Sequence, residues 1–293
     1  MRLYLVNKYL MRVKPLLYLS LLFFITACTH PNGYDVKPVP VEPFTTYLNV
    51  LYGTDTTEQV LDAYLPQVRD TVHTPVIILI HGGAWVQGEK EDFMGLGLDT
   101  FFTAAGCAVV NMNYRLIGTK YQYPAPLDDV GLVMDFIKQK AAAWQINPNR
   151  VCILGRSSGS QLALMYAYSV NANGRVKAVI DGFGPTDFCD NSIVEEPLGV
   201  NVVNMLGPYA SNMQAWHNAS PIFYMAGAVP TTIMQGTVDS TVFPIQSSML
   251  ADSLVARGKP CLYFPWVGDS HGWDQTKWLQ DRGAVLSWLQ NYL

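Results

Sequence analysis

The sequence alternates short, strand-like segments rich in apolar residues with longer stretches in which apolar residues recur at helical spacing. The apolar segments, each four to six residues long, lie at 76–80, 107–112, 151–154, 176–181, 231–234 and 261–266. Continuous apolar runs of this length are typical of strands buried on both faces of a parallel sheet. Because helical stretches separate them, the pattern predicts an α/β fold, with a mostly parallel central sheet, helices on both faces and right-handed crossovers.

The longest helical pattern covers residues 126–144, with Asp128 and Asp129 in its first turn, where the helix dipole favours negative charge. Further helices are predicted over 93–105, 158–170, 245–257 and 276–292. Two earlier segments, 45–52 and 60–65, alternate apolar and polar residues as antiparallel strands do. With no repeat and no second core in the pattern, one domain is expected over 44–293.

Residues 184–228 interrupt the alternation. This segment mixes glycine, proline and asparagine with aromatic residues and methionines, and its periodicity is weak. Long irregular insertions in compact domains often form lids or binding loops. Two interpretations therefore stay open for this cap-like insert: a lid over a site, or a few short helices packed on the sheet edge.

The N-terminus has the pattern of an export signal. Four basic residues precede residues 16–27, an uncharged apolar run that is too short to favour a membrane anchor. Ile25-Thr26-Ala27-Cys28 resembles the lipobox of bacterial lipoproteins. That resemblance implies a signal peptide over 1–27, a lipidated Cys28 and an exported protein of the bacterial cell envelope, at the outer membrane or facing the periplasm. The alternative is ordinary cleavage after Ala27, which would leave Cys28 as a thiol.

A proline-rich stretch, residues 28–43, begins at Cys28 and predicts an extended tether between the lipid and the domain. Removing residues 1–27 shifts the formal charge from −4 to −8. No cluster of Lys or Arg follows residue 14, which argues against a nucleic-acid partner. With 49% hydrophobic and 14% charged residues, the chain also lacks the composition of a disordered protein.

Four cysteines follow Cys28, and their pairing is open. An even number in an exported protein permits disulfides, but most of the four lie in or beside apolar runs, where buried free thiols are common. They are Cys107, Cys152, Cys189 and Cys261. The spacing of the cysteines and histidines shows no metal-binding motif, so no metal and no other cofactor is expected.

A G-x-S-x-G motif stands where the predicted strand 151–154 meets the predicted helix 158–170. In Gly155-Arg156-Ser157-Ser158-Gly159 the glycines allow a sharp turn, which lifts the Ser157 hydroxyl above the sheet and leaves the following amide at a helix N-terminus. In this context Ser157 is predicted to be a nucleophile. The alternative is a serine that only caps the helix.

A nucleophilic serine needs a base and a group that orients the base. The five histidines are His30, His73, His81, His217 and His271. His271 follows the last predicted strand, at the carboxyl edge where open α/β sheets gather their sites, and is the predicted base. Asp239 follows the preceding strand and is the predicted acid. The competing acids are Asp181, Asp187 and Asp269.

The segment His81-Gly82-Gly83-Ala84-Trp85 ends the first buried strand, where its backbone amides can face a developing oxyanion. The order Ser157, Asp239, His271 is that of α/β-hydrolases. Together with Asn113-Tyr114-Arg115-Leu116, Tyr123-Pro124-Ala125-Pro126 and Asp129, these motifs resemble the α/β-hydrolase superfamily. Within it they resemble the hormone-sensitive-lipase-like carboxylesterases and the bacterial feruloyl and acetyl esterases.

This resemblance implies an α/β-hydrolase fold from about residue 60 and oxyanion donors at Gly83, Ala84 and Ser158. Two positions depart from the family pattern. Ala84 stands at a usual third glycine, and Ser157-Ser158-Gly159-Ser160 stands where Ser-Ala-Gly-Gly is usual. Both changes are small and keep the backbone donors.

The resemblance implies a serine hydrolase that cleaves carboxylic esters through an acyl-enzyme. The expected partner is an ester substrate, either a small molecule or an ester linked to polysaccharide. Acetyl and feruloyl esters of plant polysaccharide belong to the second class. The alternatives are an exopeptidase of the prolyl-oligopeptidase type and a catalytically silent binding protein. Trp85, Trp266 and Trp273 flank the site motifs and would suit sugars or hydroxycinnamoyl groups, although aromatic residues there are equally typical of a core.

Overall fold

The computed structural model describes residues 44–93, 95–190, 193 and 198–293. The predicted signal peptide, the tether and Cys28 lie outside these residues. Among the described residues, an 8-stranded sheet has the spatial order β1-β2-β4-β3-β5-β6-β7-β8. Its strands are Phe44–Leu51 (β1), Val60–Pro66 (β2), Val76–Ile80 (β3), Ala108–Met112 (β4), Val151–Arg156 (β5), Val176–Gly182 (β6), Thr231–Gly236 (β7) and Cys261–Trp266 (β8).

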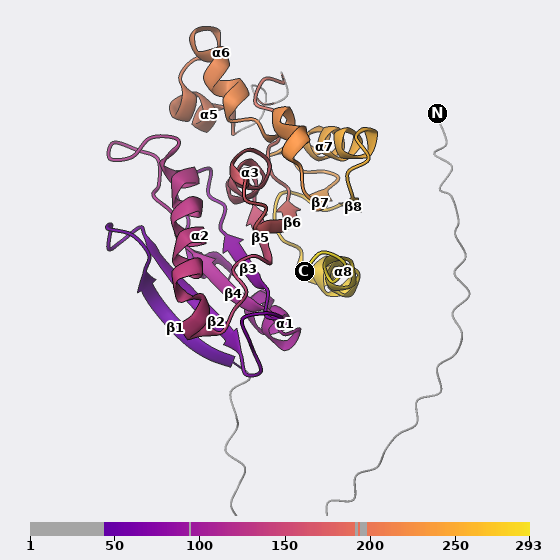
Figure 1. Cartoon of the computed structure of the whole chain (residues 1–293). Helices are drawn as coiled ribbons and strands as arrows, with labels where there is room; N and C mark the ends of the chain where they lie inside the picture. The colour runs from indigo at the N-terminus through magenta and orange to yellow at the C-terminus, as the bar shows by residue number, and fades with distance from the viewer. Residues whose placement is uncertain (1–43, 94, 191–192, 194–197) are drawn as a thin grey trace, which may run out of the picture. The chain divides into compact units, whose positions relative to one another are not determined.

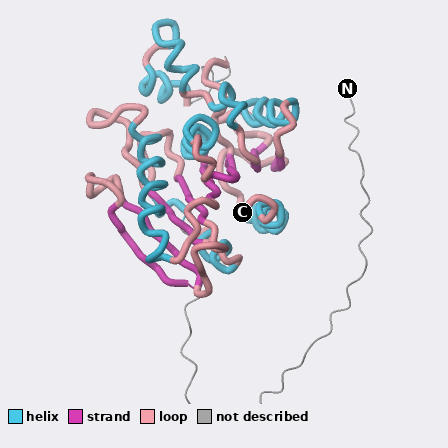
Figure 2. The backbone as a smooth tube through the Cα atoms, viewed as in Figure 1, coloured by secondary structure: helices cyan, strands magenta, loops and turns pink. Residues whose placement is uncertain are grey.

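Strand directions confirm a mostly parallel sheet. The pairs β1·β2 and β2·β4 are antiparallel, and every pair from β4 to β8 is parallel. The central strands are buried on both faces, as their continuous apolar character predicts. With the helices on either side, this is the α/β-hydrolase fold (Figures 1 and 2).

The α-helices are Leu98–Ala104 (α1), Ala125–Trp144 (α2), Ser158–Met165 (α3), Gly199–Leu206 (α5), Tyr209–Asn218 (α6), Pro244–Ala256 (α7) and Gln275–Leu289 (α8). Three shorter segments are Lys90–Phe93 (η1) and Pro221–Gly227 (η3), both 3-10 helices, and Tyr166–Val170 (η2), a π-helix. Of the segment predicted as one helix over 93–105, only α1 is α-helical, and the 3-10 helix η1 ends at Phe93, where that prediction begins. The predicted helix 158–170 widens into η2 after Met165.

Alternating residues of β3 divide the core into two layers. Ile77 and Leu79 pack in a cluster with residues of α1 and α8, whereas Ile78 and Ile80 pack in a second cluster with residues of α2, α3 and α7. Figure 1 shows α1 and α8 on one side of the sheet and α2 on the other. Because helices cover both faces of the sheet, a site can form in the loops at the carboxyl ends of the strands.

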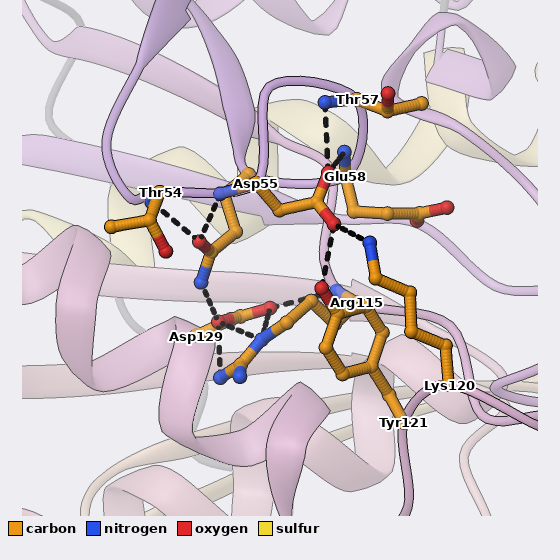
Figure 3. A network of polar contacts seen from close by, with 9 residues as sticks. Thr54, Asp55, Thr57, Glu58, Arg115, Lys120, Tyr121 and Asp129 are labelled. Carbon is orange, nitrogen blue, oxygen red and sulfur yellow. Dashed lines mark hydrogen bonds and ion pairs between the residues drawn. The ribbon is translucent and has the colours of Figure 1, made fainter.

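A polar network around Asp129 fastens the first turn of α2 to the β4–α2 connection (Figure 3). The Asp129 carboxylate is fully buried and accepts hydrogen bonds from the Arg115 amide at 2.7 Å, Arg115 Nε at 2.9 Å and Gln59 Nε2 at 2.7 Å. A buried carboxylate is tolerated when its oxygens are satisfied in this way. The network explains why Arg115 and Asp129 occur together in the sequence motifs.

The cap-like insert, residues 184–228, contains α5, α6 and η3. Phe188 and Trp216 are buried in the same cluster as residues of α3. In the described part of this segment, helix α6 and the turn at Phe188 therefore each place a large side chain in the core.

All four described cysteines are free thiols. Cys107 and Cys152 are buried, and Cys189 and Cys261 are half-buried. No helix among residues 44–93, 95–190, 193 and 198–293 has both the length and the apolar character needed to cross a membrane.

Candidate active site

Ser157 lies at the sharp turn between β5 and α3. Its backbone has φ of 52° and ψ of −121°, and its amide donates a hydrogen bond to the Gly182 carbonyl at 2.8 Å. A Cβ at Gly155 would overlap the backbone of Gly159, and a Cβ at Gly159 would overlap the carbonyl oxygens at the end of β3. Both glycines are therefore required sterically, because only they let α3 approach β3 and β5 closely enough to hold this turn.

His271 and Asp239 meet Ser157 at the carboxyl edge of the sheet. His271 Nε2 lies 3.0 Å from Ser157 Oγ, and His271 Nδ1 lies 2.8 Å from Asp239 Oδ2. An ionised carboxylate only accepts hydrogen bonds, so Nδ1 carries the proton and Nε2 is left to accept from the serine hydroxyl. The structure thus brings together the three residues that the loops after β5, β7 and β8 were predicted to supply.

The Asp239 carboxylate is buried and strongly hydrogen-bonded. Oδ1 accepts from the amides of Thr241 at 2.8 Å and Val242 at 3.0 Å, and Oδ2 also accepts from Gln235 Nε2 at 2.9 Å. Burial raises the pKa of Asp239, but the His271 side chain and the two amides outweigh it and hold the pKa below its usual value. The carboxylate is therefore ionised at neutral pH and fixes the His271 tautomer.

The predicted oxyanion segment follows β3 as a tight left-handed turn. Gly83, Ala84 and Trp85 have φ values of 115°, 52° and 62°. Among the described residues, no hydrogen bond engages the amides of Gly83, Ala84 or Ser158. Gly83 and Ala84 line the cleft beside Ser157, and Ser158 begins α3. All three amides are free to donate to a new acceptor, and the Ser158 amide lies at a helix N-terminus, which favours negative charge.

His81 belongs to the support of this turn. Its Nδ1–H donates to the Gly82 carbonyl at 2.6 Å, and its ring stacks on Tyr114 with centroids 4.2 Å apart. Burial lowers the pKa of His81 to about 4, so the imidazole is neutral at pH 7. A neutral, enclosed imidazole shapes the loop that carries Gly83 and Ala84.

Two of the three tryptophans that flank the site motifs belong to the core. Trp85 is fully buried, donates from Nε1 to Gln161 Oε1 at 3.0 Å and packs edge-to-face on Phe188. Trp266 is buried as well, and Trp273 is half-buried in the loop that carries His271. The core interpretation of these aromatic residues therefore holds for Trp85 and Trp266, which cannot stack on a substrate.

A cleft of about 310 Å³ opens beside Ser157 and His271. Its apolar wall includes Ala84, Phe183 and Leu198, of which Phe183 packs edge-to-face on His271 with centroids 4.9 Å apart. Leu198 comes from the insert, so this segment contributes to the cleft.

A second group of cleft residues, Gln87, Asp92 and Arg156, forms what we term the polar cluster. The sequence motifs do not indicate these three residues as a group. Arg156 does belong to a recognised motif, since it is the variable residue immediately before Ser157 in the serine motif. Gln87 and Asp92 lie just after the oxyanion segment, but their convergence with Arg156 depends on how the loops fold.

The remaining candidates lie elsewhere. His73 contacts Asp70 on an exposed loop, and His217 stacks on Phe223 in the insert. Among the competing acids, Asp181 is fully buried at the end of β6, where its Oδ1 accepts from the Gly184 amide, whereas His271 Nδ1 contacts Asp239. In the part of the chain that the structure describes, no group of three His, Cys, Asp or Glu side chains is arranged to hold a metal ion.

The amino-acid sequence is similar to those of known proteins. The family profile BD-FAE matches residues 61–254, more than half of the chain. The probable carboxylic ester hydrolase LipM of Mycobacterium tuberculosis is 26% identical over 224 residues, which are 71% of this chain and 52% of that protein. Esterase LipC of the same organism is 24% identical over 241 residues, 77% of this chain and 59% of that protein. The chain thus spans little more than half the length of these curated relatives.

Two solved structures share the fold. A truncated carbohydrate esterase from gut microbiota superposes with a TM-score of 0.70 at 23% identity, over 84% of this chain and 96% of that chain. A bifunctional GH43-CE protein from Bacteroides eggerthii superposes with a TM-score of 0.72 at 24% identity, over 84% of this chain and 35% of that chain. Because both sequence identities are below 25%, the structural similarity establishes the fold alone.

Proposed function

The chain belongs to the BD-FAE family, and from that premise we propose that it is a serine-dependent carboxylic ester hydrolase. The observation that carries this proposal is the chain of contacts from Ser157 Oγ through His271 to Asp239, at 3.0 and 2.8 Å, beside an open cleft. Curated relatives described as esterases and ester hydrolases support the same reaction.

In the first half-reaction, Ser157 Oγ attacks the ester carbonyl carbon while His271 Nε2 takes the hydroxyl proton. The carbonyl oxygen becomes an oxyanion and accepts hydrogen bonds from the amides of Gly83, Ala84 and Ser158. Collapse of the tetrahedral intermediate breaks the bond to the alcohol, which leaves with the proton from His271. The acyl group remains on Ser157.

In the second half-reaction, water attacks the acyl carbon and gives a proton to His271 Nε2. The second tetrahedral intermediate collapses, the acid leaves, and Ser157 Oγ regains its proton from His271. Asp239 stays ionised throughout and stabilises the imidazolium that forms twice in the cycle.

A fluorophosphonate probe and short p-nitrophenyl esters test this mechanism. The native enzyme is expected to be labelled and to hydrolyse p-nitrophenyl acetate, whereas Ser157→Ala is expected to lose the label and at least about 10³-fold in kcat. Wild-type rates in Ser157→Ala would overturn the assignment. An unlabelled native chain without hydrolase activity would instead support the catalytically silent alternative.

We further propose that the ester is carried by a sugar, as in acetylated or feruloylated polysaccharide. The solved neighbour that is described as a carbohydrate esterase supports this class. The cleft of about 310 Å³ is at the small end of the usual range for ligand sites, which favours a short acyl group. A side-by-side assay on acetylated xylan, methyl ferulate, p-nitrophenyl acetate and p-nitrophenyl decanoate is the test, and the acetyl esters are expected to be the better substrates.

We also propose that the protein is exported and anchored by lipid at Cys28, from the lipobox-like sequence that ends there. Metabolic labelling with palmitate tests the anchor. Label is expected on the native chain and is expected to be absent from Cys28→Ser. Label that persists in the variant, or an unlabelled native chain, would contradict the proposal.

A further inference from the structure

The polar cluster of Gln87, Asp92 and Arg156 shares the cleft with Ser157 but takes no part in the proposed acyl transfer. Arg156 donates from Nη1 to the Asp92 carbonyl at 2.9 Å, and its guanidinium lies 5.3 Å from the centre of the Phe93 ring. Its Nε is buried without a hydrogen-bond partner, and within the described part of the chain Arg156 forms no ion pair. A guanidinium has five N–H donors, so most of them are not engaged beside the nucleophile.

The Asp92 carboxylate offers the complementary group. Its Oδ2 accepts one hydrogen bond, from the Glu89 amide at 3.2 Å, and the side chain is exposed in the cleft. The carboxylate only accepts hydrogen bonds, the guanidinium only donates them, and the Gln87 amide does both. The formal charges of Asp92 and Arg156 cancel. An anionic ligand would meet Asp92 and a cationic ligand would meet Arg156, whereas hydroxyl groups, which donate and accept, suit both.

The loop that carries Asp92 is held firmly in place. Lys90 is almost fully buried, and its Nζ donates to Asp62 Oδ2 at 3.0 Å. The Lys90 amide donates to Asn113 Oδ1 at 2.6 Å, and Asn111 Nδ2 donates to the Lys90 carbonyl at 2.7 Å. These contacts bind η1 to β2 and β4. Pre-organised polar groups bind a ligand with less ordering cost than mobile ones.

We propose that Gln87, Asp92 and Arg156 form a subsite for neighbouring hydroxyl groups of the neutral sugar that carries the ester. The polar cluster then determines specificity for the alcohol part of the substrate. This inference rests on the proposed ester hydrolysis at Ser157 and adds the residues that select a hydroxyl-rich alcohol over a simple one.

A pair of substrates with the same acyl group provides the test. Mono-O-acetylated methyl β-xylopyranoside and p-nitrophenyl acetate form the same acetyl-enzyme, so deacylation is common to both and the alcohol is the difference. In Asp92→Asn and in Arg156→Gln, the ratio of kcat/KM for the sugar ester to kcat/KM for p-nitrophenyl acetate is expected to fall roughly 10- to 100-fold, as expected for loss of a charged hydrogen bond. A loss of nucleophilic reactivity at Ser157 that affects both esters equally cancels in this ratio.

Glu89→Gln is the matched control. It removes one carboxylate close to Asp92 in the chain, but Glu89 does not line the cleft, so the ratio is expected to stay within about twofold of wild type. Arg156→Lys keeps the charge but loses the planar array of donors, so it is expected to recover only part of the ratio.

Two results would overturn the subsite. One is a ratio within twofold of wild type in both Asp92→Asn and Arg156→Gln. The other is a wild-type preference for the acetylated methyl glycoside of a uronic acid over the neutral xyloside, which would assign Arg156 to a carboxylate. Failure of the proposed function is distinguishable, because wild type would then hydrolyse neither ester and Ser157 would not react with the fluorophosphonate probe.

Discussion

Asp239 is distinguished from the other acids near the site by its contacts. It receives hydrogen bonds from His271, from Gln235 and from two backbone amides, so both oxygens are fixed. Asp269, which lies two residues before His271 in the chain, has a buried Oδ2 without a hydrogen-bond partner. The acid that contacts His271 is therefore Asp239, 32 positions away in the sequence, and not Asp269, which is two positions away.

Replacing Asp239 by Asn is expected to lower kcat for p-nitrophenyl acetate by about 10²- to 10⁴-fold. The amide cannot hold Nδ1 as the proton-bearing nitrogen of His271 with the strength of a carboxylate, so Nε2 loses its function as base. Steady-state kinetics with a thermal unfolding curve are the measurement. Asp269→Asn is the matched control and is expected to retain activity within about threefold. A larger loss in Asp269→Asn than in Asp239→Asn would reverse the assignment.

Asp181 is a second unusual carboxyl group, at the end of β6. It is fully buried, and its Oδ1 accepts from the Gly184 amide at 2.9 Å while Oδ2 has no hydrogen-bond partner. Burial raises the pKa of Asp181 to about 7, and the Gly184 amide offsets part of this effect. Between about pH 4 and pH 7 the folded protein thus holds a proton that the unfolded chain releases, so stability falls as the pH rises through this window.

Asp181→Asn is expected to remove this pH dependence, because the amide is neutral throughout. Relative to wild type, the variant should gain roughly 1–3 kcal/mol at pH 8 and almost nothing near pH 4. Urea unfolding at a series of pH values measures the difference. Asp135→Asn changes an exposed carboxylate and serves as control. A stability difference between Asp181→Asn and wild type that does not change with pH would contradict the raised pKa.

At the scale of elements, the sequence predicts most helices and strands within one or two residues, because continuous apolar runs and helical periodicity are local signals. The 3-10 turn before α1 and the π-helix after α3 were not predicted. Tyr168 in η2 shares a hydrogen bond at 2.5 Å with Thr231 of β7, a contact between residues 63 positions apart. A contact over such a sequence separation leaves no periodic trace in the sequence, so local periodicity does not indicate it.

Helix α3 depends on its close approach to β3. Gly159→Ala is expected to destabilise the protein by roughly 3 kcal/mol or more, because its Cβ would overlap the carbonyl oxygens of Ile80 and His81. Gly131→Ala in α2 is the matched control. Its Cβ would make an ordinary contact, 3.7 Å from the Tyr166 ring, and the change is expected to stabilise by about 0.5–1 kcal/mol. Denaturant unfolding measures both, and equal effects would contradict the close approach.

At the scale of the whole molecule, every residue assigned to the site lies between Gly82 and Gly272. The first strand begins at Phe44 and pairs with Pro66. The 8-stranded sheet, the candidate triad and the cleft beside it therefore all lie within the described residues.

A chain that begins at Phe44 is expected to hydrolyse p-nitrophenyl acetate with kcat/KM within about twofold of the full-length protein. The sheet, the triad and the oxyanion segment are all retained in this chain. Kinetics on the two purified proteins, with their thermal unfolding midpoints, are the measurement. A large loss of activity at an unchanged midpoint would mean that residues before Phe44 take part in the site.

The candidate triad was predictable because each member follows a recognisable strand, and carboxyl ends of parallel strands share one edge. The walls of the cleft were not predictable in the same way. Leu198 comes from the insert and Asp92 from a turn fixed by the buried Lys90, so their positions depend on tertiary contacts. The sequence therefore indicates the chemistry more directly than it indicates the substrate.

The backbone at Ser157 limits which nucleophile this site can use. At a φ of 52° a side chain branched at Cβ is strongly disfavoured. Cysteine has the unbranched shape of serine and would place its sulfur within reach of His271, whereas threonine would force the turn to open. Exchange of the nucleophile, in evolution or in the laboratory, is thus restricted by the turn itself to residues that are unbranched at Cβ.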